Sequence, residues 1–258
     1  MEASIQTSTA VAMAEGIRLV DVERTLGGKP VLRGVDLRVP LHGRVGIVGR
    51  SGTGKSTLLS LVAGLDSPNG GTIGVGGATA AGERLARCVL MPQRDCLLPW
   101  RTALDNAALA LENHGFARRE ARAAAAELFT RVGLAGSERL RPSQLSGGMR
   151  QRVAFVRTLL TGKGVLLLDE PFGALDAITR AELHEWLRDT LAAEPRTVLL
   201  VTHDVEEALL LCDTVAVLTE GRVAATIDVD VPRDGPRREV VTSPGFAELR
   251  ERALEAIE

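Results

Sequence analysis

Apolar residues in this chain follow two patterns that predict different kinds of β-strand. Between residues 17 and 39 apolar and polar positions alternate, and residues 27–30 supply turn chemistry in the middle. This pattern predicts a small antiparallel β layer. Residues 45–48, 165–168 and 198–201 are continuous apolar runs instead. Such runs are typical of strands buried on both faces of a parallel sheet. Shorter apolar stretches predict further strands over residues 72–75, 88–91, 214–218 and 222–231.

Helical spacing of apolar residues marks the remaining regions. Residues 102–160 are rich in Ala, Arg and Leu, and a helix is predicted over 117–132 with Gly133 as its stop signal. Residues 178–191 repeat apolar positions at helical spacing, which places Trp186 in the core, and a short helix is expected over 244–257. The predicted fold class is α/β, with a mixed β core, an antiparallel β layer and an inserted α-helical subdomain.

Composition and charge set the broad class. The 258 residues are 45% apolar and 25% charged, which is typical of a soluble globular protein. No apolar run approaches the roughly 20 residues that span a bilayer. The net charge of −2 gives no electrostatic footprint for nucleic acid or an anionic membrane surface. Residues 1–15 carry no positive charge and no sustained apolar core, so they predict a flexible tail and not a secretory signal.

The cysteines are few and scattered. Cys88, Cys96 and Cys212 show no C-x-x-C spacing and are odd in number. This argues against a disulfide framework or a zinc site and fits a reducing cytosol. All three are expected to be packing residues.

A glycine-rich stretch after the apolar run 45–48 predicts a nucleoside-triphosphate site. Strand, glycine-rich turn and helix form the context in which G-x-x-x-x-G-K-[ST] binds phosphate. The glycines leave backbone N–H groups pointing into one concavity, and the helix turns its positive end to the same point. Lys55 is expected to neutralise the β- and γ-phosphates, and Ser56 to ligate Mg²⁺. The residues expected to bind the nucleotide here are Gly49, Arg50, Ser51, Gly52, Thr53, Gly54, Lys55, Ser56 and Thr57.

Two adjacent carboxylates directly follow the apolar run 165–168: Asp169 and Glu170. The C-terminal end of a buried parallel strand lies at the crevice where such folds bind ligands. Adjacent carboxylates make chemical sense when one holds the metal and the other acts on the nucleophile. Asp169 is therefore expected to hold Mg²⁺, and Glu170 to orient or deprotonate the attacking water.

A second helix start suited to phosphate begins at Ser146, which precedes Gly147 and Gly148. Ser146 is a good N-cap, and the two glycines expose the free N–H groups of the helix. The chain thus offers two phosphate-binding helix starts for one nucleotide. Either the second is structural, or it binds phosphate on a different molecule.

These motifs together resemble those of ATP-binding cassette (ABC) proteins over about residues 17–231. The resemblance is carried by Ser146, Gly147, Gly148 and Gln151 with the phosphate loop and residues 168–171. It implies ATP and Mg²⁺ as ligands, and a head-to-tail homodimer in which residues 146–148 contact the γ-phosphate held by the partner. It also implies one ABC ATPase domain over 16–258, made of a RecA-like core (16–92 and 161–231), a helical subdomain (93–160) and a short C-terminal segment (232–258).

The resemblance implies roles for three further residues. Gln93 looks like the Q-loop glutamine, which senses Mg²⁺ and water. Asp176 resembles the D-loop residue at the dimer seam, and His203 looks like the switch histidine that contacts the γ-phosphate. The other histidines, His42, His114 and His184, are expected to be structural or on the surface.

One position departs from the family pattern. The family places an aromatic residue before the first glycine turn, where it stacks on adenine. This chain has Leu26 there and no aromatic residue before Trp100. Because base stacking contributes ~1–3 kcal/mol, Leu26 and Val31 are expected to give adenine an apolar, weakly selective seat.

Three functions compete for such a chain. A metabolic phosphoryl-transfer enzyme leaves residues 146–148 unexplained. A soluble cassette ATPase acting on DNA or ribosomes predicts a second cassette, a long coiled coil or a basic face, and the sequence has none of these. Residues 97–106 resemble importer cassettes of the nitrate, sulfonate and taurine group, with thiamine-precursor importers close by. There a coupling helix of the membrane subunit docks, and Trp100 is expected to lie in that contact.

The sequence therefore predicts the ATP-hydrolysing subunit of an ABC importer for a small polar solute. The resemblance implies membrane permease subunits and a solute-binding protein as partners, no nucleic acid, and a position on the cytoplasmic face of the cell membrane. The partners choose the solute. About 27 residues follow Val231, too few for an independent regulatory domain.

Overall fold

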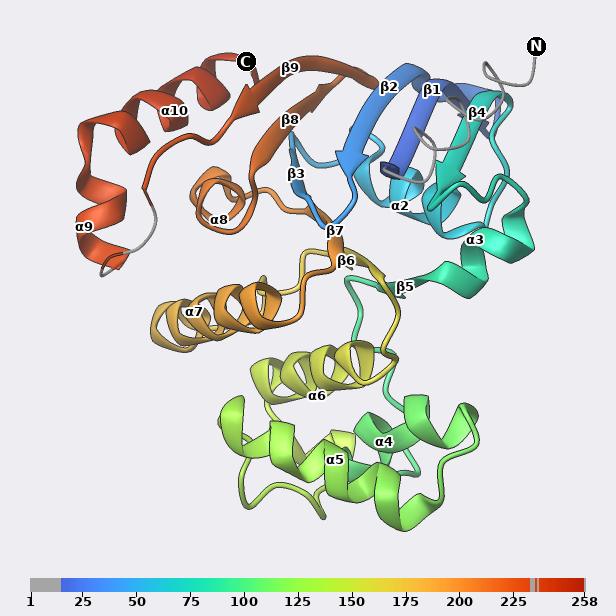
Figure 1. The fold of residues 1–258 in the computed structure, drawn as a ribbon, viewed down its shortest axis with the longest axis vertical. Helices are drawn as coiled ribbons and strands as arrows, with labels where there is room; N and C mark the ends of the chain where they lie inside the picture. Colours follow the sequence, from blue (N-terminus) through green and yellow to red (C-terminus); the bar gives the residue numbers. More distant parts are fainter. Residues whose placement is uncertain (1–14, 233–234, 236, 258) are drawn as a thin grey trace, which may run out of the picture. The chain divides into compact units, whose positions relative to one another are not determined.

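The computed structural model describes residues 15–232, 235 and 237–257, and the chain divides into two compact units (Figure 1). The first unit contains the chain up to Leu90, Gly164–Asp169 and the chain from Pro195 onward. The second contains Met91–Lys163 and Glu170–Glu194. Residues 1–14 of the expected tail lie outside the described residues, whereas Glu15 is buried and pairs with Arg18 and Arg38.

The antiparallel layer of the first unit confirms the alternating pattern. It consists of β1 (Glu15–Leu26), β2 (Lys29–Pro40) and β4 (Gly70–Val75) in the order β2-β1-β4, with both pairs antiparallel. Gly27 and Gly28, with φ of +55° and +79°, form the turn between β1 and β2. Glycine adopts this left-handed conformation without a steric penalty.

The central sheet of the same unit has six strands in the order β5-β6-β7-β3-β8-β9. The strands are β5 (Cys88–Met91), β6 (Val165–Asp169), β7 (Thr197–Val201), β3 (Arg44–Val48), β8 (Thr214–Thr219) and β9 (Arg222–Asp228). β6, β7, β3 and β8 run parallel, and β9 is antiparallel to β8. Every residue of β6 and β7 is buried, as their continuous apolar sequences predict.

Five helices of the first unit surround these strands among the described residues: α2 (Lys55–Ala63), α3 (Ala81–Arg87), α8 (Val205–Leu211), α9 (Arg237–Thr242) and α10 (Pro244–Glu255). Leu58, Leu61 and Val62 of α2 are fully buried in one core with residues of both sheets, which fixes the start of this helix. α8 packs closely on β3. A Cβ at Gly46 of β3 would lie only 3.0 Å from the Cβ of Ala208 in α8, so a side chain at this position would be crowded. α3, α8 and α9 were not predicted from the sequence.

The second unit is mainly helical. It contains α4 (Ala103–Asn113), α5 (Arg118–Arg131), α6 (Gly147–Leu159), α7 (Ala177–Ala193) and a single 3₁₀ turn (Pro142–Gln144). α4, α5 and α6 pack against one another (Figure 1). α5 lies one residue inside the predicted bounds at each end, and Gly133 follows it with φ of +66°. Trp186 of α7 packs edge-on against Phe155 of α6, as expected for a core residue.

One expectation about packing was wrong. Cys96 is exposed, whereas Cys88 and Cys212 are buried as predicted. The loop around Cys96 is fixed through its backbone, because Arg157 donates hydrogen bonds to the carbonyl oxygens of Asp95 and Cys96 at 2.7 and 2.9 Å. Ile178 continues the apolar spacing of α7 but is 74% exposed.

Candidate functional site

Three parallel strands of the first unit end at the same level. Ile47 of β3 and Asp169 of β6 both pair with Val201 of β7. The phosphate loop after β3, the carboxylate Asp169 and the turn that carries His203 therefore lie at one edge of the sheet. This carboxyl edge is where open α/β sheets bind their ligands.

The glycines of the phosphate loop are required by space and by backbone conformation. A Cβ at Gly49 would lie 2.2 Å from the carbonyl oxygen of Leu218. Gly52 and Gly54 have φ of +84° and +100°, which other residues rarely adopt. A Cβ at Gly54 would also lie 2.9 Å from the Val31 side chain. The loop conformation therefore depends on these glycines.

The phosphate loop curls around the ammonium group of Lys55. Its Nζ donates hydrogen bonds to the carbonyl oxygens of Gly49 and Arg50, both at 2.8 Å, and the residue is 6% exposed. Thr53 donates its hydroxyl proton to the same Arg50 oxygen at 2.9 Å. A cation held at the N-terminus of α2 is suited to binding an anion, because the free N–H groups of the helix point to the same place.

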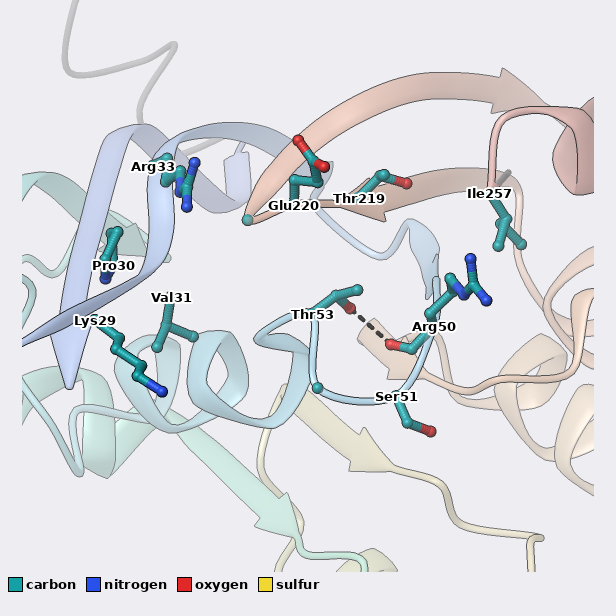
Figure 2. A pocket seen from close by; sticks show the side chains of 12 residues that line it. Lys29, Pro30, Val31, Arg33, Arg50, Ser51, Thr53, Thr219, Glu220 and Ile257 are labelled. Atoms are coloured by element: carbon teal, nitrogen blue, oxygen red, sulfur yellow. Dashed lines mark hydrogen bonds between the residues drawn. The ribbon is translucent and has the colours of Figure 1, made fainter. Parts of the chain in front are cut away.

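A pocket of about 620 Å³ lies beside this loop, which is a usual size for a small-molecule site (Figure 2). Figure 2 shows Val31 of β2 on one side of the phosphate loop and Ile257 on the other. Leu26, which is 42% exposed, is not among the residues that line this pocket. The lining residues are Lys29, Pro30, Val31, Arg33, Arg50, Ser51, Gly52, Thr53, Thr219, Glu220, Gly221 and Ile257.

Sequence reasoning missed two parts of this pocket. The turn at Glu220 was predicted only as a strand connection, and Ile257 only as the end of a helix. Thr219 donates a hydrogen bond from its hydroxyl to the carbonyl oxygen of Ala256 at 3.3 Å, which holds the segment next to Ile257 beside the turn. Because these segments are far from the phosphate loop in sequence, no local pattern could have assigned them.

In the second unit, Glu170 is held by two glutamines. Gln93 Nε2 donates to Glu170 Oε2 at 3.1 Å, and Gln151 Nε2 donates to the Glu170 carbonyl oxygen at 3.4 Å. Glu170 has φ of +46°, a left-handed conformation that is uncommon outside glycine. Such strained residues cluster at functional sites. Gln93 thus restrains the carboxylate of Glu170, and Gln151 restrains its backbone.

Ser146 caps α6, as the sequence predicts. Its Oγ accepts a hydrogen bond from the Met149 N–H at 3.1 Å, and Gly147 and Gly148 form the first turn. Arg150 donates to the Leu145 carbonyl oxygen at 2.9 Å and pairs with Asp95 at 2.9 Å. This ion pair, which sequence reasoning missed, ties the start of α6 to the loop that follows Gln93.

Asp176 caps α7. Its carboxylate accepts hydrogen bonds from the N–H groups of Ile178 and Thr179 at 3.2 and 3.0 Å, and from the Thr179 hydroxyl at 2.7 Å. These bonds from Thr179 lower the pKa of Asp176. The residue is therefore anionic at neutral pH, and the turn before α7 has a fixed geometry.

The donor chemistry also suits Mg²⁺. Ser56 offers a hydroxyl oxygen at the start of α2, and Asp169 a carboxylate that is 6% exposed at the end of β6. Gln93, the third residue predicted to bind Mg²⁺, belongs to the second unit. Mg²⁺ prefers such oxygen ligands and completes its shell with water and substrate phosphates.

A family model described as "ABC transporter" matches residues 32–173, more than half of the chain. The chain belongs to the ABC transporter family.

Several curated ABC proteins are similar over most of their length. The chain is 49% identical over 222 residues to the aliphatic sulfonates import ATP-binding protein SsuB 1 of Rhodococcus jostii, covering 86% of each chain. It is 45% identical over 221 residues to the formylaminopyrimidine import ATP-binding protein ThiZ of Halalkalibacterium halodurans, again covering 86% of each. These relatives are import ATP-binding proteins, so they favour the importer and not the soluble ATPase alternative.

The fold of solved ABC cassettes matches as well. A dimeric structure of the ATP-binding cassette MJ0796, in a post-hydrolysis state with ADP and Pi, superposes with a TM-score of 0.77 and 28% identity. The match covers 84% of this chain and 100% of the MJ0796 chain. The predicted cassette fold is confirmed, and ATP hydrolysis is the general activity of the family. Within the part of the chain that the structure describes, no helix is long and apolar enough to cross a membrane.

Proposed function

We propose that this chain is the ATP-hydrolysing subunit of an ABC importer that works with membrane permease subunits and a solute-binding protein at the cytoplasmic face of the cell membrane. The observation that carries the proposal is the identity of 49% to an import ATP-binding protein over 86% of both chains. The curled phosphate loop around Lys55 and the pocket beside it support the same function from geometry.

ATP occupies the pocket beside the phosphate loop. Backbone N–H groups of residues 49–57 and the Lys55 ammonium bind the phosphates, and the anion replaces the loop carbonyl oxygens as the lysine's partner. Val31 of the pocket lining and Leu26, which lies outside that lining, form the apolar seat for adenine. Because no described residue that lines the pocket is aromatic, base selectivity is weak.

Ser56, Gln93 and Asp169 would hold Mg²⁺, which would supply positive charge to the β- and γ-phosphates. Glu170 accepts a proton from the attacking water, and Gln93 keeps its carboxylate in position through the 3.1 Å hydrogen bond. His203 donates to the γ-phosphate.

Two copies of the chain form a head-to-tail dimer. Ser146, Gly147 and Gly148 at the start of α6 seal the ATP bound by the partner, and Asp176 lies at the seam. Support comes from the solved structure of the cassette MJ0796, which is described as dimeric. ATP binding closes this dimer, and hydrolysis with phosphate release opens it.

The permease subunit docks on the segment that contains Trp100. This side chain is 69% exposed, and a large exposed aromatic residue is typical of a protein–protein contact. The solute is an aliphatic sulfonate or a formylaminopyrimidine, which are the solutes in the names of SsuB 1 and ThiZ.

Uptake by a strain without this gene tests the proposal. Restoring the gene should restore transport of either an aliphatic sulfonate or a formylaminopyrimidine, and a Lys55→Ala variant should not. Normal uptake of both solutes in the deletion strain would contradict the importer role.

A further inference from the structure

The turn that carries His203 is fixed to the strand that leads into the phosphate loop. The N–H of Thr202 donates to the carbonyl oxygen of Ile47 at 3.1 Å, and Ile47 lies two residues before Gly49. Thr202 is 1% exposed. Its backbone therefore follows any movement of that strand.

The hydroxyl of Thr202 both donates and accepts a hydrogen bond. It donates to Oε2 of Glu207 at 2.5 Å and accepts a hydrogen bond from the N–H of Asp204 at 3.1 Å. Glu207 is a carboxylate on α8 that is only 4% exposed. Because a hydroxyl has one proton, the acceptor at Glu207 directs that proton away from Asp204 and leaves a lone pair facing the Asp204 N–H.

The other side of the turn is fixed as well. The Asp204 carboxylate caps α8 by accepting from the N–H groups of Glu206 and Glu207 at 2.9 and 3.2 Å. His203 lies between Thr202 and Asp204 and is exposed. The structure thus presents an exposed imidazole on a turn whose two neighbours are both anchored.

We propose that Glu207 is a positioning residue for His203, acting through the hydroxyl of Thr202. The inference rests on the proposed contact of His203 with the γ-phosphate. Burying a carboxylate costs free energy unless it is hydrogen-bonded, and Oε2 of Glu207 accepts such a bond from the hydroxyl of the residue next to the histidine. Without this bond the hydroxyl rotates, the turn shifts, and the imidazole misses the phosphate. A misplacement of about 1 Å costs up to about a hundredfold in rate.

Thr202→Val removes the hydroxyl with little change of shape. We expect its kcat for ATP hydrolysis to fall about tenfold to a hundredfold, while the Kd of a fluorescent ATP analogue stays at the wild-type value. Thr202→Ser, which keeps the hydroxyl, should recover most of the rate. Glu207→Gln keeps an acceptor oxygen and should lose less than Glu207→Ala.

Thr197→Val is the matched control. Thr197 is a fully buried threonine at the start of β7, the strand that ends just before Thr202, and its hydroxyl oxygen accepts a hydrogen bond from the N–H of His42 at 2.9 Å. The Thr197→Val variant should lose stability in the same way as Thr202→Val, but its kcat should stay at the wild-type value. Equal loss of kcat in both variants would reduce the role of Thr202 to folding and overturn the inference.

The full-length chain carrying His203→Ala separates the two proposals. If Thr202 acts through the histidine, adding Thr202→Val to His203→Ala should lower kcat no further, whereas multiplying losses would overturn the inference. If His203→Ala alone keeps wild-type kcat, the proposed role of His203 fails. If His203→Ala is impaired and Thr202→Val is not, only the positioning role of Glu207 fails.

Discussion

Gln93 donates a hydrogen bond from Nε2 to Oε2 of Glu170 at 3.1 Å, and Glu170 holds a left-handed backbone with φ of +46°. The glutamine thus restrains the carboxylate of a residue whose backbone conformation is already unusual. In the proposed chemistry, the carboxylate is the base and the amide sets its direction.

Replacing Glu170 by Gln should stop hydrolysis and leave ATP binding intact. The variant keeps the size of the side chain but removes the proton acceptor, and a positioned general base contributes about 10²–10⁴-fold. Phosphate release and the Kd of a fluorescent ATP analogue measure the two effects. Glu185→Gln, at an exposed position of α7, is the control and should behave as wild type. Wild-type turnover in Glu170→Gln would remove Glu170 from the chemistry.

Leu26→Tyr should tighten ATP binding. A tyrosine there supplies the stacked base contact that this chain lacks, and such a contact contributes ~1–3 kcal/mol, or about 5- to 150-fold in Kd. Leu41→Tyr, at another exposed leucine of the same unit, should leave the Kd unchanged. A calorimetric titration in which Leu26→Tyr binds like wild type would show that Leu26 is not beside the base.

Trp100→Ala should weaken association with the permease subunits without changing nucleotide binding. The indole is 69% exposed, so its removal leaves no cavity in the isolated chain. Copurification of tagged permease with the cassette measures the contact. Phe116→Ala, at a second exposed aromatic residue of the same unit, is the control. Normal copurification yield with Trp100→Ala would argue against the docking role.

Asp105 should make the chain sensitive to acid. Burial would raise the pKa of its carboxyl, but hydrogen bonds from Thr102 and Arg118 and the charges of Arg122 and Arg118 outweigh it and hold that pKa below its ordinary value. A lowered folded-state pKa stabilises the fold above the unfolded value of about 3.9 and loses that contribution as pH falls through the folded value.

Asp105→Asn should therefore cost about 1.5–3 kcal/mol of unfolding free energy above about pH 5. The difference from wild type should shrink as pH falls toward 3, because wild type then loses its charge as well. Denaturant titrations at several pH values measure this. Asp189→Asn, at an exposed carboxylate, is the control. A difference that stays constant with pH would show that the charge of Asp105 is not responsible.

The features that depend only on local sequence were predictable. The phosphate loop has Gly49 at a fixed spacing before Gly54 and Lys55, so its motif could be recognised directly. The buried strands could be recognised from their continuous apolar residues. The cap at Ser146 was also local, since its partner is the N–H three residues later.

Features that depend on distant parts of the chain were not predictable. Ile257 lines the same pocket as Arg50, and the packing of α10 brings Ile257 there. Cys96 was expected inside, but its loop is held through backbone carbonyl oxygens by Arg157, and no pattern of apolar residues reports such bonds.

The central claim is that each chain seals the ATP of its twin, and the mass of the Glu170→Gln protein with Mg²⁺ and ATP tests it most directly. Light scattering after gel filtration should show a dimer with ATP and a monomer with ADP. Adding Ser146→Arg, which blocks the start of α6, should return the ATP-bound protein to a monomer. If Glu170→Gln with ATP stays monomeric, both alone and with its permease subunits, the proposed mechanism is wrong.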